Sequence, residues 1–271
     1  MNGRRVPILQ YAFLALITVT VAAPFIGFAL NAFSSRWFFP QLLPTTWSTD
    51  AWKHIFSGRS KVPVALLNSL LVAATVTAVS IVLGLPAARA LGLHAIPGKR
   101  ALLFTILSPT MVPPLAVGMG LTVTFLRLGL GGTLAGVALV HLVPALPYVV
   151  LSLTGVFANY TTAYEEQART LGAGPVRVFL RITLPAILPG IVVAGLFAFL
   201  ISWSQYVLTM LIGGGRILTM PVLLFSVIPG GDNAAIAALS MLFIAPSLLI
   251  LAFTSRYLTG MSAAMRITGR P

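Results

Sequence analysis

The chain has 271 residues, of which 58% are hydrophobic and only 8% charged, with a mean hydropathy of +1.00. A soluble domain must cover its surface with polar groups, so this composition excludes a water-soluble globular protein and indicates a membrane protein. The formal net charge of +13 does not indicate nucleic-acid binding, because the 17 lysines and arginines lie in short gaps between apolar runs.

Six long apolar segments predict an all-α membrane protein. Each is longer than the roughly 20 helical residues that cross about 30 Å of hydrocarbon. Backbone groups inside a bilayer must hydrogen-bond within their own segment, and the short alternating segments of a β-barrel do not occur. We therefore predict one transmembrane domain over residues 1–271. The spans are predicted at 8–33, 64–88, 101–126, 132–157, 186–212 and 234–257.

The loop 34–63 between the first two spans contains several aromatic residues, which favour the membrane interface. We predict a short interfacial helix near 48–57, with Ser48 or Thr49 as its N-cap. The simpler interpretation is that the aromatic side chains only anchor the loop.

The distribution of basic residues predicts the orientation. Most of the 17 lysines and arginines flank the spans on the side that holds both termini and the loop 158–182. The positive-inside rule therefore places both termini in the cytoplasm of a multi-pass protein of the bacterial inner membrane.

The segment 158–185 interrupts the apolar pattern with a polar, partly amphipathic stretch. Thr162 and Glu165 fit a capping box, which predicts that a helix begins here. Spacings of four and three residues would place three apolar side chains on one face of that helix. These side chains are Tyr164, Ala168 and Leu171.

Gly172 is expected to end this first helix, and Pro175 to begin a second one. The alternative is that both helices lie on the membrane surface. Such helices are usually rich in lysine and arginine, whereas residues 162–168 contain two acids and no base. The first helix is therefore predicted to contact a soluble partner, while the second helix remains compatible with the membrane surface.

The same segment contains a spaced motif. Its residues, in order, are Glu166, Ala168, Gly172, Ile182, Leu184 and Pro185. Three residues separate Ala168 from Gly172, and nine separate Gly172 from Ile182. This spacing resembles the signature of type I ABC-importer permease subunits, which is E-A-A, three residues, G, nine residues, I-x-L-P. Gln167 departs from the motif by replacing its first alanine.

This resemblance implies a six-helix permease fold and a coupling helix around Tyr164–Leu171 that docks in a cleft of an ATP-binding subunit. The residues it implies for ATPase coupling are Tyr164, Glu165, Glu166, Ala168, Leu171, Gly172, Ile182, Leu184 and Pro185. The implied partners are two ATP-binding subunits, a second permease subunit that is homologous or identical, an extracytoplasmic solute-binding protein, and membrane lipid.

The chain itself is predicted to be non-catalytic and to bind no cofactor. It lacks the phosphate-binding sequence G-x-x-x-x-G-K-[ST], and Gly98-Lys99-Arg100 has neither the preceding glycine nor the hydroxyl residue. ATP and Mg²⁺ are therefore expected on the partner ATPase subunits.

The solute is the least constrained prediction. Leu171 precedes the motif glycine, as in permeases of the spermidine/putrescine group, whereas maltose-type permeases usually have an acid there. This resemblance suggests a polyamine. A tentative translocation pathway consists of the polar patch Ser202, Trp203, Gln205 and Tyr206. The alternative for this patch is hydrogen bonding between helices.

Two other classes of function fit the sequence less well than a permease subunit. A self-contained secondary carrier or channel would place ionisable residues or ion sites inside the spans, and the predicted span interiors lack aspartate, glutamate, lysine and arginine. An intramembrane enzyme would need a catalytic constellation that the chain does not contain. A metal site is not expected, because His54, His94 and His141 share no ligand spacing and cysteine is absent. His54 and His141 are expected to be interfacial.

Overall fold

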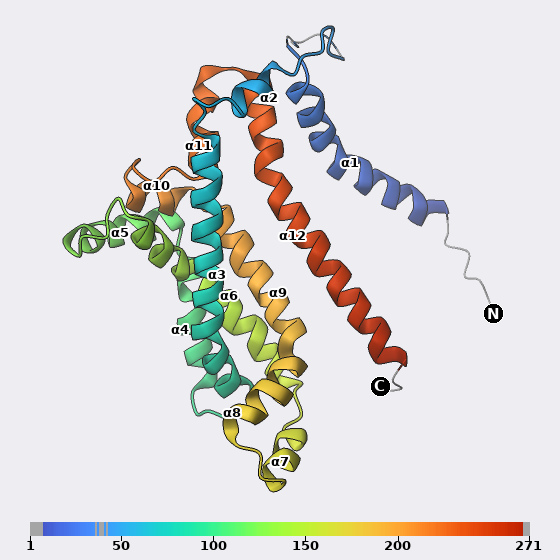
Figure 1. Cartoon of the computed structure of the whole chain (residues 1–271), viewed down its shortest axis with the longest axis vertical. Helices are drawn as coiled ribbons and strands as arrows, with labels where there is room; N and C mark the ends of the chain where they lie inside the picture. The colour runs from blue at the N-terminus through green and yellow to red at the C-terminus, as the bar shows by residue number, and fades with distance from the viewer. Residues whose placement is uncertain (1–7, 36, 38–40, 42, 268–271) are drawn as a thin grey trace. The chain divides into compact units, whose positions relative to one another are not determined.

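The computed structural model describes residues 8–35, 37, 41 and 43–267, and nearly all of them are helical (Figure 1). Contacts divide the chain into two compact units. One comprises Met1–Pro63 with Leu223–Pro246, and the other Val64–Val222 with Ser247–Pro271. The two termini, for which the sequence predicts a cytoplasmic location, end in residues 1–7 and 268–271, outside the described residues.

The first unit contains α1 (Ile8–Ala32) and the predicted short helix, which is α2 (Asp50–Ile55). Thr49 occupies the N-cap position without a side-chain bond, and the Ser48 hydroxyl instead accepts a hydrogen bond from the Asp50 amide at 3.0 Å. The 3-10 turn η2 (Ile228–Gly230) also belongs to this unit.

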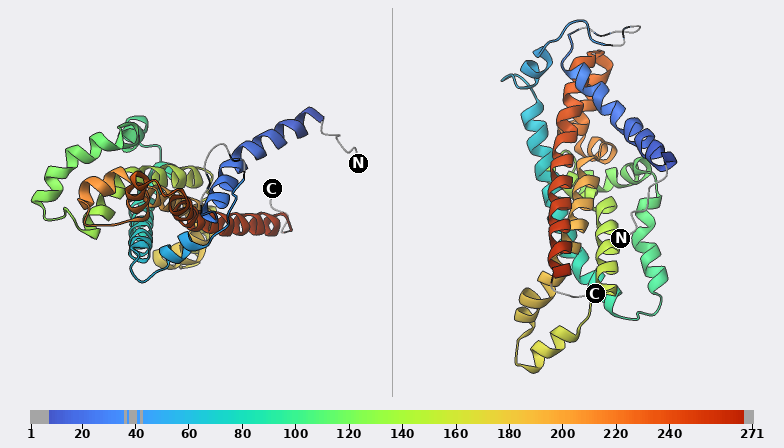
Figure 2. Two further views of the ribbon diagram at one scale, coloured as in Figure 1. Left: turned by 90° about the horizontal axis from the view of Figure 1, so that it is seen from above. Right: turned by 90° about the vertical axis from the view of Figure 1, so that its right-hand side faces the viewer.

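The second unit has its core between α6 (Leu134–Ala158) and α9 (Leu184–Trp203), which pack side by side (Figures 1 and 2). Leu153, Phe157 and Ile187 are fully buried between these helices. Gly190 permits the close approach, because a Cβ atom there would overlap the Val156 side chain.

Two predicted spans are interrupted rather than continuous. The segment 101–126 forms α4 (Lys99–Met111) and α5 (Pro114–Arg127), which meet at an angle of 93° (Figure 2). Pro113 and Pro114 explain this turn, because proline lacks an amide donor and forces the residue before it out of the helical region. Val112 accordingly adopts an extended backbone.

The segment 186–212 is also divided. α9 ends at Trp203, and α10 (Val207–Gly213) begins after three residues. A further short helix, α11 (Met220–Val227), was not predicted as a separate element. α3 (Val62–Leu93) and α12 (Asn233–Ile267) extend beyond their predicted segments.

Five helices of the described residues are long and apolar enough to cross a membrane, or six if the bent α4–α5 pair forms one span. Large apolar side chains remain exposed on several of them, for example Val82 at 71% and Phe253 at 72%. Contiguous apolar surface of this kind is unfavourable in water and favourable against lipid. The fold is therefore that of an all-α, multi-pass membrane protein.

Candidate functional site

The polar segment forms α7 (Ala163–Thr170), and its first turn differs from the predicted capping box. The Thr162 hydroxyl makes no cap bond to the backbone and donates to the carboxylate of Glu166 at 3.0 Å. Glu165, the predicted partner of Thr162, is only 3% exposed. The capping-box prediction is wrong because Glu165 has stronger partners inside the protein.

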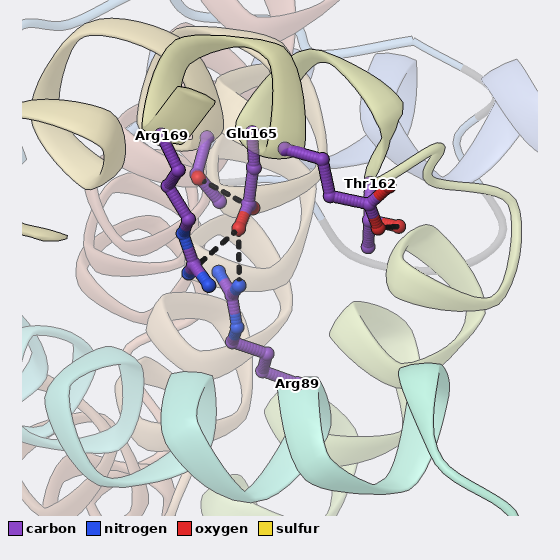
Figure 3. A network of polar contacts seen from close by, with 6 residues as sticks. Arg89, Thr162, Glu165 and Arg169 are labelled. Atoms are coloured by element: carbon purple, nitrogen blue, oxygen red, sulfur yellow. Dashed lines mark hydrogen bonds and ion pairs between the residues drawn. The ribbon is translucent and has the colours of Figure 1, made fainter. Parts of the chain in front are cut away.

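These partners come from two other helical elements (Figure 3). The Arg89 guanidinium of α3 lies 2.6 Å from one oxygen of the Glu165 carboxylate. The hydroxyl of Thr183, which ends the π-helix η1 (Phe179–Thr183), donates to the other oxygen at 2.7 Å. Arg169, one turn along α7, approaches to 3.6 Å. We call Glu165, Arg89 and Thr183 the anchor of α7.

The anchor is ionic. Burial alone raises the pKa of the Glu165 carboxyl, but its polar neighbours together, with the Arg89 hydrogen bond foremost and the Arg89 charge and the Thr183 hydrogen bond adding to it, lower the pKa by more. The net result is a lowered pKa, so the carboxylate is charged at neutral pH. The Tyr160 hydroxyl lies beside it without hydrogen-bond geometry, and burial raises the pKa of this phenol.

The opposite face of α7 is exposed. Tyr164 is 51% and Leu171 88% exposed, whereas Ala168 is half-buried. Tyr164 and Leu171 thus form a small exposed apolar surface at the end of α7. Gln167, which departs from the motif, is also exposed.

Gly172 ends α7 as predicted, with a left-handed backbone at φ +84°. The Gly172 amide donates to the Arg169 carbonyl and the Ala173 amide to the Ala168 carbonyl. This pair of bonds is the Schellman motif, in which glycine is favoured because it adopts a positive φ without strain.

The second helix begins at Pro175 as predicted, but α8 (Pro175–Val178) is short and continues through η1 into α9. The remaining motif residues lie along this continuation. Ile182 is in η1, and Leu184 and Pro185 form the first turn of α9. From Pro175 onwards, the polar segment therefore continues into α9 without a break in helical structure.

The predicted pathway residues fall into two groups. Ser202 and Trp203 are buried, at 4% and 2% exposure, and the Trp203 ring stacks on Phe199. Gln205 and Tyr206 lie in the break between α9 and α10 and are partly exposed. Gln205 also lines a cavity of about 260 Å³.

His141 of α6 was expected at an interface, and this prediction is wrong. The ring is 1% exposed and lies 2.9 Å from the Ser202 hydroxyl and 2.9 Å from the Thr209 hydroxyl. It therefore connects both sides of the break in α9–α10. In the part of the chain that the structure describes, no three histidine, cysteine, aspartate or glutamate residues gather as a metal site would require.

Sequence reasoning missed Arg89, Thr183, His141 and Thr209 as site residues. Arg89 had contributed only to the topology prediction. Its partner Glu165 is 76 residues away, and no local pattern indicates such a pairing.

The helical arrangement defines a class of protein, an all-α multi-pass membrane protein. It resembles a crystal structure of a bacterial ABC transporter involved in the import of the acidic polysaccharide alginate, with a TM-score of 0.74 and 17% identity. The match covers 95% of this chain and 99% of that chain.

Residues 80–266 match the family of binding-protein-dependent transport system inner membrane components, and the chain belongs to this family. One relative is the molybdenum transport permease ModB of Mycobacterium tuberculosis strain H37Rv, with 33% identity covering 71% of this chain and 78% of ModB. Another is the putrescine transport permease PotI of Escherichia coli strain K12, with 29% identity covering 82% and 80%. Membership of this family confirms the prediction that the chain is a permease subunit of an ABC importer in the inner membrane.

Proposed function

We propose that this chain lines part of the translocation pathway of an ATP-driven importer, and that α7 is its coupling helix. The observation that supports this most directly is the two-sided construction of α7. One face is held inside the protein by the Glu165 anchor, and the other presents Tyr164 and Leu171. A helix that transmits force needs both a rigid attachment and a contact surface.

The anchor offers a route for that force. A displacement of α7 acts on α3 through Arg89 and on η1 and α9 through Thr183. Because interfaces between packed helices rearrange as units, a rigid connection moves whole helices rather than a loop. Nucleotide on the ATPase shifts the permease only if it binds the two conformations with different affinity.

The proposed assembly contains two ATP-binding subunits, which hold ATP and Mg²⁺, a second permease subunit, and an extracytoplasmic solute-binding protein. Both termini and α7 face the cytoplasm in this arrangement. The predominance of basic residues on that side supports the orientation.

A polyamine is one candidate solute. The putrescine permease relative supports it, but the molybdenum permease relative is equally compatible with the family and the fold. The four acids of the chain give no further support. Asp50 is in α2, Asp232 directly precedes α12, and Glu165 and Glu166 are in α7, so a cation inside the spans would need carboxylates from a partner.

The test is a pair of variants on α7 in the complex purified from native membranes and reconstituted in liposomes. Leu171→Asp places a charge on the proposed contact face and is expected to reduce uptake driven by ATP about tenfold, as removal of an interface anchor does. Gln167→Ala, exposed on the same helix, is the control and should transport normally.

Equal transport by both variants would contradict the coupling role of α7. Uptake by this chain alone, driven by an ion gradient and without an ATPase, would instead favour the alternative of a self-contained carrier.

A further inference from the structure

The cavity beside Gln205 lies where the two interrupted helices meet. Thr110 at the end of α4 and Pro114 at the start of α5 line one side, and Ser204 and Gln205 line the other. Tyr148 of α6 completes its polar lining. Breaks in membrane helices are tolerated where the freed backbone is buried in protein or faces a polar cavity, and such breaks recur at solute sites.

A hydrogen-bonded chain holds this break in place. Thr209 donates its hydroxyl hydrogen to the Gln205 carbonyl at 2.7 Å, so it must accept from His141 Nε2. A buried ring without an acidic partner is neutral, and a neutral imidazole that donates at Nε2 accepts at Nδ1, here from the Ser202 hydroxyl. The ring thus forms one hydrogen bond on each side of the break, to Ser202 and to Thr209. The Thr209 hydroxyl in turn holds the backbone of Gln205 at the cavity.

The chemistry of the lining selects a type of ligand. None of the twelve residues around the cavity is charged. The hydroxyl hydrogens of Thr110 and Ser204 are already donated to the carbonyls of Leu107 and Leu200, so these groups can only accept from a ligand. The Gln205 amide and the Tyr148 phenol both donate and accept.

We propose that this cavity contacts the transported solute, and that the solute is an uncharged polyhydroxyl molecule such as a sugar. Hydroxyl groups donate to the acceptors and accept from the donors that the lining offers, and the aromatic ring of Tyr148 suits the apolar face of a sugar. An ammonium or an oxyanion would lose its hydration without a compensating charge. This proposal depends on the transport function proposed above.

The motif residue that suggested a polyamine does not argue against this ligand. Leu171 is at the exposed end of α7 and is not among the residues that line the cavity. It cannot select the solute through contact there.

Because the chain contains no cysteine, single substitutions report on the cavity directly. Ser204→Cys in the purified complex is treated with neutral, cationic and anionic methanethiosulfonates, with Thr161→Cys in the exposed loop before α7 as the control. Relative to the control, the neutral reagent should react at least about tenfold faster than either charged reagent. Thr110→Cys repeats the measurement from α4, in case Ser204→Cys does not fold.

Protection then tests solute contact. A mixture of neutral mono- and disaccharides should slow labelling of Ser204→Cys at least about twofold, as half-occupancy requires, and putrescine and molybdate should not. Faster labelling by a charged reagent, no labelling at either position, or no protection by sugars would overturn the proposal. Each of these results leaves ATPase co-purification and α7 coupling intact, so the two proposals fail separately.

Discussion

Two of the buried polar connections between helices of the second unit differ in charge. At α7, Glu165 and Arg89 form an ion pair in which the acid is 3% exposed. Beside the cavity, His141 joins Ser202 and Thr209 through neutral hydrogen bonds. Removing one partner of the ion pair would leave a buried charge, whereas the neutral connection shapes a cavity without imposing a charge on it.

The largest effect should follow from breaking the ion pair on its basic side. Arg89→Ala leaves the Glu165 carboxylate buried without its main partner, which is expected to cost about 3 kcal/mol of unfolding free energy. Thermal unfolding of the purified subunit in detergent measures the loss. Glu165→Gln is the matched variant and should cost less, because Arg89 is partly solvated and the amide leaves no buried charge.

A loss in Glu165→Gln as large as in Arg89→Ala would show that the pairing is not mainly electrostatic.

The neutral connection should give the next largest effect. His141→Ala removes two hydrogen bonds and a buried ring, leaving the hydroxyls of Ser202 and Thr209 without this partner, for an expected loss of about 2 kcal/mol. The same unfolding measurement applies, and His141→Gln, which retains a donor and an acceptor, should recover part of the loss. No recovery by glutamine would contradict the role assigned to the hydrogen bonds.

The ion pair should also make the stability depend on pH. The pKa of Glu165 is lowered below its unfolded value of 4.5, so its stabilisation is complete above pH 4.5 and is lost as the pH falls through the folded pKa. Stability measured from pH 7 downwards should therefore fall below pH 4.5 in the parent chain and less steeply in Glu165→Gln. An identical acid profile in both chains would exclude this carboxylate as a contributor.

The smallest effect concerns the end of α7. Gly172→Ala forces a side chain into φ +84° with open space around it, so the expected cost is about 1 kcal/mol from backbone strain alone. Thermal unfolding of the purified subunit should therefore show only a small decrease in stability. Gly174→Ala, nearby with a negative φ, is the control and should be neutral.

The long helices, the end of α7 and the start of α8 could be predicted from local sequence, because apolar length, Gly172 and Pro175 act within a few residues. The break after Trp203 could not be predicted, since residues 204–206 contain neither proline nor glycine and the break is held by His141 from another helix. The role of Glu165 was also mistaken. A local capping pattern was outweighed by a partner in α3.

The size of the bend at Pro113 and Pro114 could not be predicted from the sequence. Prolines are tolerated within membrane helices, so their presence did not distinguish a kink from the observed angle of 93°.

The central claim is that the exposed face of α7 meets an ATPase subunit, and a single crosslink tests it most directly. Leu171→Cys should crosslink to the co-purified ATP-binding subunit through a short reagent that joins a thiol to an amine, with a yield that changes on addition of ATP. Phe56→Cys, at a position that is also exposed (66%), lies in the loop 34–63 between the first two spans, which the predicted orientation places outside the cytoplasm, and should give none. Crosslinking to the ATPase from Phe56→Cys but not from Leu171→Cys would contradict the account.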